Sequence, residues 1–162
     1  MICEFMANTI FISYSRKQTD KAKDLDNQIL SGVYWWLDSR IPGSVNWWDN
    51  ICEAIEESYC IVALMSKSYI ESVFCMAELE YARELRKPIL CFLLEPDVTY
   101  PPQLATIQYV EIFEWDTNRA LVELLQSLIR IEKDYLNGTY DADRSPRPEL
   151  RRPTRPAHRR WR

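Results

Sequence analysis

The order of apolar and amphipathic segments constrains the fold of this chain more than any other feature. Short apolar runs suited to strands alternate with longer segments in which apolar residues recur every three or four positions. Strands separated by helices within one domain predict a parallel sheet with helices on both faces. The expected strands are residues 9–13, 33–37, 59–65, 89–94 and 107–113. We therefore predict an α/β fold of the flavodoxin-like kind, with a five-stranded parallel sheet in the order 2-1-3-4-5.

The segments between these runs have the periodicity of helices. Expected helices cover residues 19–31, a segment that begins at Trp47, and residues 121–135. A further helix is expected to run to about Arg86, because Ser68 and Glu71 have the S-x-x-E spacing of a capping box. Residues 1–140 are thus expected to form a single domain.

Glycine and histidine are too few for several classes of enzyme. With 3 glycines, neither common glycine motif for phosphate binding can be written. The single histidine, His158, disfavours catalytic triads and histidine-rich metal sites. The 5 cysteines include no C-x-x-C pair, so we expect buried thiols in a reducing compartment. No apolar run approaches the roughly 20 residues that span a bilayer. We therefore expect a cytoplasmic protein without a resident metal or cofactor.

Charge is distributed unevenly along the chain. Residues 1–140 hold 12 basic and 21 acidic residues, whereas residues 141–162 hold 8 arginines and 3 acidic residues. Four of the 9 prolines also lie in this C-terminal stretch. Its low apolar content predicts a disordered tail. The tail is interpreted as a solvated segment or linker, or alternatively as a tether to polyanions or to the acidic domain.

Polar residues follow the expected strands at the edge where sheets of this kind bind ligands. Tyr14, Ser15 and Arg16 come directly after the first strand. An aromatic ring, a hydroxyl and a cation suit a ligand with a flat base and phosphates, although a polar turn would look the same. The loops of interest are residues 13–19, 38–46 and 66–68.

A carboxylate and an aromatic residue share one face of the helix expected to end near Arg86. Phe74 and Glu78 are four positions apart, so the ring could stack on a base while the carboxylate stabilises a sugar cation. The spacing alone favours a surface glutamate on an acidic helix. In the preceding helix, Trp47 is expected to pack in the core and Trp48 to lie at a surface or an interface.

Taken together, these segments resemble the Toll/interleukin-1 receptor (TIR) domain in its bacterial form, over about residues 8–135. The motifs that carry the resemblance are Ile10-Phe11-Ile12-Ser13-Tyr14-Ser15, Trp36-Leu37-Asp38 with Ile41-Pro42-Gly43, Trp47-x-x-x-Ile51-x-x-x-Ile55-x-x-Ser58, Ser66-x-x-Tyr69, Ser72, Phe74-Cys75-x-x-Glu78-Leu79 and Lys87-Pro88-Ile89.

The resemblance implies cleavage of NAD⁺ at the nicotinamide–ribose bond, with Glu78 as the catalytic residue. Phe74 stands where many family members have tryptophan, which keeps a ring but leaves the product open between ADP-ribose and a cyclic isomer. Self-association through residues 38–46, the family's BB loop, would complete the site, and the product would signal to a downstream effector. The substrate-binding residues implied are Tyr14, Ser15, Arg16, Asp38, Ile41, Trp47, Ser66 and Phe74.

Two other functions stay open at this point. The family also contains non-catalytic scaffolds that signal by self-association through the BB loop. An enzyme similar to nucleoside deoxyribosyltransferases would share the sheet and the N-glycosidic chemistry, but its motifs do not fit these residues. The pairing of Glu78 with an aromatic ring favours an NAD⁺-cleaving enzyme of an anti-phage or cell-death pathway.

Overall fold

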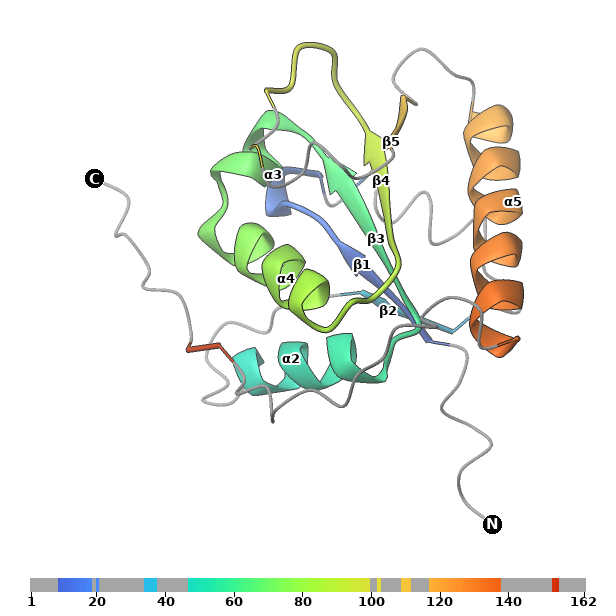
Figure 1. Cartoon of the computed structure of the whole chain (residues 1–162). Helices are drawn as coiled ribbons and strands as arrows, with labels where there is room; N and C mark the ends of the chain where they lie inside the picture. Colours follow the sequence, from blue (N-terminus) through green and yellow to red (C-terminus); the bar gives the residue numbers. More distant parts are fainter. Residues whose placement is uncertain are drawn as a thin grey trace.

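A five-stranded parallel sheet lies at the centre of the molecule (Figure 1). The computed structural model describes residues 9–18, 20, 34–37, 47–99, 102, 109–111, 117–137 and 153–154. The strands are β1 (Thr9–Ser13), β2 (Tyr34–Leu37), β3 (Cys60–Met65), β4 (Ile89–Leu93) and β5 (Tyr109–Glu111). They lie in the order β2-β1-β3-β4-β5, and every neighbouring pair is parallel. The predicted α/β class with a parallel sheet is confirmed.

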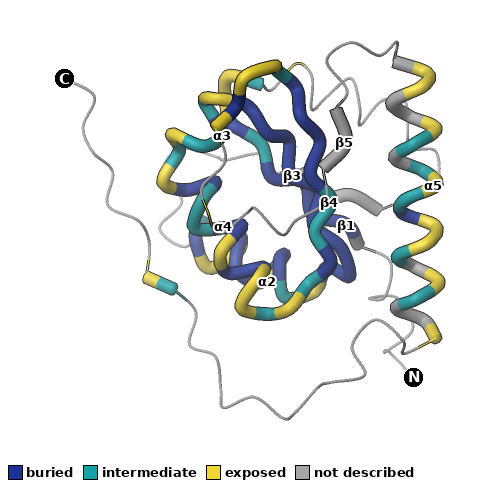
Figure 2. Tube along the Cα trace, turned by 45° about the horizontal axis from the view of Figure 1, so that its top comes forward, coloured by how far each residue is buried: buried dark blue, intermediate teal, exposed yellow. Residues whose placement is uncertain are grey.

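Helices cover both faces of the sheet. On one face lie α2 (Trp47–Glu57) and α4 (Val73–Glu84), and on the other lies α5 (Thr117–Leu136). The short α3 (Lys67–Glu71) precedes α4. All six residues of β3 are buried, as Figure 2 shows, because this strand is covered from both sides.

The side chains of β1 alternate between two hydrophobic clusters. Phe11 packs with residues of α2 and α4, whereas Ile10 and Ile12 pack in the cluster that contains Leu128 of α5. This period of two is the normal pattern of a strand. Ser13 ends β1 on the α2 and α4 side by the same alternation, and it pairs in register with Ala63 of β3.

The single helix expected between residues 68 and 86 is wrong, because two helices meet at Ser72. Ser66, in an extended conformation, accepts a hydrogen bond from the Tyr69 N–H and caps α3. Ser72 is also extended, and its hydroxyl accepts from the Cys75 N–H to cap α4. Ser68 lies inside α3 and caps neither helix. The apolar period continues across Ser72, so periodicity alone does not reveal the break.

Several expected features lie outside the described residues. They are the helix at residues 19–31 apart from Asp20, the loop at residues 38–46, and the tail at residues 141–162 apart from Pro153 and Thr154. Within the described part of the chain, no helix is long and apolar enough to cross a membrane. Four cysteines there are buried thiols outside any disulfide bond, as expected, namely Cys52, Cys60, Cys75 and Cys91.

Candidate functional site

Three buried polar side chains meet at the carboxyl end of β1. Ser13 comes from the end of the strand, Tyr69 from α3 and Glu78 from the second turn of α4. Ser13 and Tyr69 are fully buried, and Glu78 is only 1% exposed. The alternative of a surface glutamate at position 78 is therefore wrong. Burial of a carboxyl lowers the stability of the folded state unless the carboxyl is hydrogen-bonded.

A chain of hydroxyl groups leads to the carboxyl of Glu78. The Ser13 hydroxyl donates to Glu78 Oε2 at 2.7 Å and lies 2.8 Å from the Tyr69 Oη. Because a serine hydroxyl has one proton, Ser13 that donates to Glu78 must accept from Tyr69. The Tyr69 hydroxyl also lies 3.4 Å from the Cys75 carbonyl, a longer and weaker contact. Tyr69 thus orients Ser13, and Ser13 holds one oxygen of Glu78.

Tyr69 is kept in its protonated form. Burial raises the pKa of its hydroxyl well above the ordinary value, and Cys75 and Glu78 raise it further. The hydrogen bond with Ser13 acts in the opposite direction but is outweighed. Tyr69 can donate to Ser13 only while its hydroxyl is protonated. The raised pKa is therefore consistent with Tyr69 as the donor in this hydrogen bond.

Helix caps position the residues of this site. The Ser72 cap fixes the start of α4, six residues before Glu78. Ser66 is fully buried and acts on the site through its cap of α3, which carries Tyr69. Its hydroxyl also lies 2.9 Å from that of Ser68. Ser66, predicted to bind substrate, is therefore held in the local structure that supports the hydroxyl chain.

An aromatic cluster lies one helical turn from Glu78. Phe74 of α4 has its ring centre 5.0 Å from that of Trp47 and 6.1 Å from that of Trp48. The two tryptophans are 5.9 Å apart in an edge-on arrangement. Trp48 is the buried member of the pair and Trp47 the half-buried one. The sequence-based assignment was the reverse and is wrong, because helical spacing fixes the angle between neighbouring side chains and not which of them faces the core.

The loop after β1 is joined to the start of α4. The Cys75 thiol lies 3.4 Å from the Tyr14 carbonyl, to which it donates. Tyr14 is half-buried and Ser15 is buried, whereas Arg16 is exposed in the 3₁₀ turn η1 (Arg16–Gln18). The Ser15 hydroxyl accepts the N–H of Lys17 at 3.3 Å, so it stabilises the turn.

The structure thus brings part of the predicted site together. Phe74 lies one turn before Glu78 on α4 and contacts Trp47 of α2, and Tyr14 is tied to α4 through Cys75. Two predicted residues, Asp38 and Ile41, lie outside the described residues.

Sequence reasoning missed the roles of Ser13 and Tyr69, and it missed Glu95 altogether. A hydroxyl residue at the end of an otherwise apolar strand was the available signal for Ser13. Glu95 follows β4 and accepts hydrogen bonds from the Lys67 N–H at 3.2 Å and from the Gln18 side chain at 3.3 Å. It therefore links the loop after β1 to the start of α3. Among the residues that the structure describes, no group of three or more histidine, cysteine or acidic residues could hold a metal ion.

The family model described as TIR domain matches residues 10–125. This chain belongs to the TIR domain family. The structure is similar to the TIR domain of the Toll-related receptor TRR-2 from Hydra magnipapillata, with a TM-score of 0.59 and 22% identity over 75% of this chain and 97% of that chain. It is also similar to the CMP N-glycosidase BcmB of Clostridium botulinum, with a TM-score of 0.55 and 18% identity over 74% of this chain and 98% of that chain. At these identities the likeness shows the fold alone. A comparison with curated protein sequences found no match.

Proposed function

We propose that this TIR domain cleaves the nicotinamide–ribose bond of NAD⁺, as a signalling enzyme of an anti-phage or cell-death pathway. The observation that carries the proposal is Glu78, a buried carboxyl held by Ser13 at the ligand-binding edge of the sheet. The family contains enzymes of this kind, and a glutamate is essential to them at the matching position.

The chemistry needs few groups. When the bond between ribose C1′ and the nicotinamide nitrogen breaks, nicotinamide leaves as a neutral molecule with the bonding electron pair. The ribose then carries positive charge, as in glycoside hydrolysis. Glu78 stabilises this charge and orients a ribose hydroxyl. Water adds at C1′ and releases a proton to give ADP-ribose, or a nitrogen of the adenine adds to give a cyclic isomer.

The aromatic cluster supplies the remaining surface of the proposed pocket. Phe74 lies one turn before Glu78. Trp47 is half-buried and contacts the ring of Phe74. Flat rings beside a carboxylate suit a substrate with a flat base next to a sugar. Tyr14, Ser15 and Arg16 follow β1 at the same edge, where Arg16 is exposed and suited to the diphosphate.

Access to Glu78 requires a change from the described state. A side chain that is 1% exposed cannot receive a ribose, so the carboxyl must be uncovered when substrate binds or when domains assemble. Self-association through residues 38–46 is our proposal for that step. It makes assembly a condition of activity, with the product passing to a downstream effector. The four cysteines within the described residues are buried thiols outside any disulfide bond, which favours a cytoplasmic setting for this activity.

The substrate is tested by incubating concentrated protein with NAD⁺ or with CMP and separating the products by chromatography and mass. CMP is included because one solved structure of this fold is named a CMP N-glycosidase. The proposal expects nicotinamide from NAD⁺, and the accompanying product distinguishes hydrolase from cyclase. Cytosine from CMP without nicotinamide would assign another N-glycosidic substrate. Neither product, even with a crowding agent, would contradict catalysis and favour the non-catalytic scaffold that assembles through the same loop.

A further inference from the structure

Part of the C-terminal stretch lies against the domain. The Trp48 indole N–H donates a 2.9 Å hydrogen bond to the Pro153 carbonyl, across 105 positions of sequence. Figure 1 shows the described segment, Pro153 and Thr154, beside one end of α2. Pro153 is half-buried and Thr154 is exposed. A partly buried proline with a bonded carbonyl is a specific contact, which a merely solvated tail would not make.

The sequence around Pro153 has the composition of a polyproline ligand. Residues 151–156 read Arg-Arg-Pro-Thr-Arg-Pro, so Pro153 and Pro156 have P-x-x-P spacing. Such segments favour an extended helix with three residues per turn and no internal hydrogen bonds. Their carbonyls are therefore open to donors, and aromatic-lined grooves bind them at a low cost in ordering entropy.

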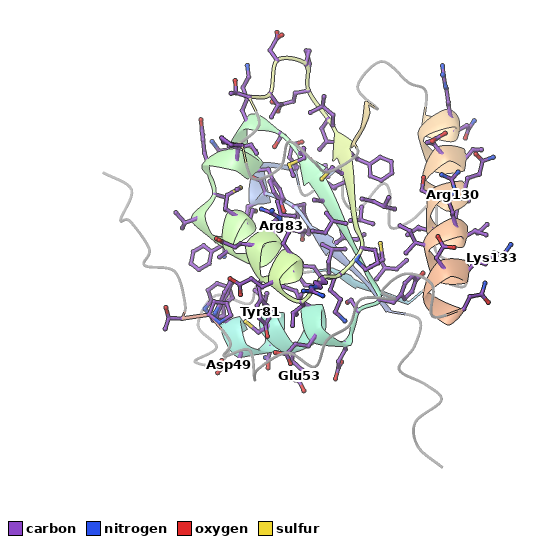
Figure 3. All side chains as sticks on the ribbon, viewed as in Figure 1. Asp49, Glu53, Tyr81, Arg83, Arg130 and Lys133 are labelled. Atoms are coloured by element: carbon purple, nitrogen blue, oxygen red, sulfur yellow. The ribbon has the colours of Figure 1, made fainter. Side chains whose placement is uncertain are left out.

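The receiving surface has both features that such a ligand needs. Trp48 supplies the indole donor, and Trp47 beside it supplies a half-buried ring. Acidic residues then follow along the same helix. Asp49, Glu53 and Glu57 are all exposed, and Figure 3 shows Asp49 and Glu53 on the side of α2 away from the sheet.

Charge complementarity follows from the covalent reach of the chain. Arg152 is bonded to Pro153, and Arg151 and Arg155 are two residues from it. With about 3.8 Å between successive Cα atoms, all three begin within about 8 Å of Pro153. The sequence thus sets three positive charges next to Pro153, and α2 exposes Asp49, Glu53 and Glu57, so opposite charge favours docking.

We propose that residues 151–156 are an intramolecular ligand, docked in polyproline form on the surface made by Trp47, Trp48, Asp49 and Glu53. This docking goes beyond the proposed function, because it requires neither NAD⁺ nor catalysis. The docking surface and the candidate site are adjacent in the fold, since Phe74 contacts Trp48 and lies one turn from Glu78. The docked segment thus braces the aromatic side of the candidate site from outside.

The test measures exchange of the Trp48 indole proton with solvent, by NMR on the full chain. Trp48→Phe assigns the signal, because it removes the indole and keeps a ring. The substitutions Pro153→Gly and Pro156→Gly together destroy the polyproline preference and keep the charges. We expect exchange about 10-fold faster in this variant, because the hydrogen bond no longer protects the proton. The matched control, Pro146→Gly with Pro148→Gly, is expected to exchange like the wild type.

Three results would overturn the proposal. Equal exchange in wild type and in the Pro153/Pro156 variant would show that the segment does not protect Trp48. Equal acceleration by the control pair would show that no particular part of the tail is recognised. Faster exchange on dilution would assign the ligand to a second copy of the chain. Raising the salt from 0.05 to about 0.5 M is expected to speed exchange, since it screens the arginines from α2, and no response would refute the electrostatic part.

Discussion

The hydroxyl of Ser13 donates a 2.7 Å hydrogen bond to Glu78 across 65 positions of sequence. It joins the end of the central strand β1 to the second turn of α4, and both side chains are at most 1% exposed. Both positions depend on the fold. The register of β1 with β3 positions Ser13, and the Ser72 cap at the start of α4 positions Glu78. The proposed chemistry of Glu78 therefore depends most directly on this hydrogen bond.

Ser13→Ala is expected to destabilise the protein and to slow NAD⁺ cleavage. Alanine leaves the Glu78 carboxyl and the Tyr69 hydroxyl short of a buried partner, at a cost of about 1–3 kcal/mol in the free energy of unfolding. Loss of the bond that orients Glu78 is expected to lower kcat about 10-fold or more. Urea unfolding and a nicotinamide assay measure the two effects. Wild-type values of both would show that the hydrogen bond does not matter.

Ser13 and Tyr69 are expected to act as one unit. Tyr69→Phe removes the donor to Ser13 and keeps the ring. The hydrogen bond between the two residues is then already absent, so adding Ser13→Ala to Tyr69→Phe destabilises the protein by less than Ser13→Ala does in the wild type. The double variant is therefore expected to be destabilised by less than the sum of the single changes. A double-mutant cycle from urea unfolding measures this difference. Strict additivity would contradict the hydroxyl chain.

Stability is expected to fall in alkaline solution because of buried thiols. Burial raises the pKa of Cys91 from 9.0 to about 12, so the folded state keeps the proton that the unfolded state loses. The contribution is fully present below pH 9.0 and is lost as the pH rises toward 12. Cys91→Ala is expected to show a flatter decline than wild type across this window, measured by urea unfolding at several pH values. Parallel declines would exclude Cys91 as a cause.

Ser72→Ala is expected to destabilise the protein more than Ser68→Ala. Ser72 caps α4 through the Cys75 N–H, and loss of such a cap costs about 1 kcal/mol. Ser68 caps no helix and has only the nearby hydroxyl of Ser66 as its described partner. Urea unfolding of the two variants compares them directly. A larger loss from Ser68→Ala would restore the capping box suggested by the sequence.

Activity per molecule is expected to rise with protein concentration. Glu78 is buried in the single chain, and we propose that assembly through residues 38–46 uncovers it before catalysis. An NAD⁺ cleavage assay from dilute to concentrated protein, with and without a crowding agent, measures this dependence. A rate strictly proportional to protein would contradict a requirement for assembly.

The sequence predicts the parallel α/β class well because apolar strands and amphipathic helices have distinct periods. The break at Ser72 escapes this reasoning, since the apolar spacing passes through it unchanged. The order of Trp47 and Trp48 escapes it as well, because periodicity gives relative and not absolute directions. In both cases the missing information is tertiary.

The candidate site divides in the same way. Glu78 and Phe74 can be found from the family motif, and their spacing of four places both on one face of a helix. The roles of Ser13 and Tyr69 cannot, since their contact depends on how β1, α3 and α4 meet in space. The contact of Pro153 with Trp48 joins residues 105 positions apart, so no local sequence pattern predicts it.

The most direct test of the account compares Glu78→Gln with Glu80→Gln in NAD⁺ cleavage. Glutamine at position 78 keeps the size and an acceptor for Ser13 but removes the charge, whereas Glu80 is an exposed glutamate two residues along the same helix. With circular dichroism confirming both folds, Glu78→Gln is expected to release nicotinamide at least about 100-fold more slowly than wild type. Glu80→Gln is expected to match wild type. Wild-type release of nicotinamide by a folded Glu78→Gln protein would contradict the assignment of Glu78 as the catalytic residue.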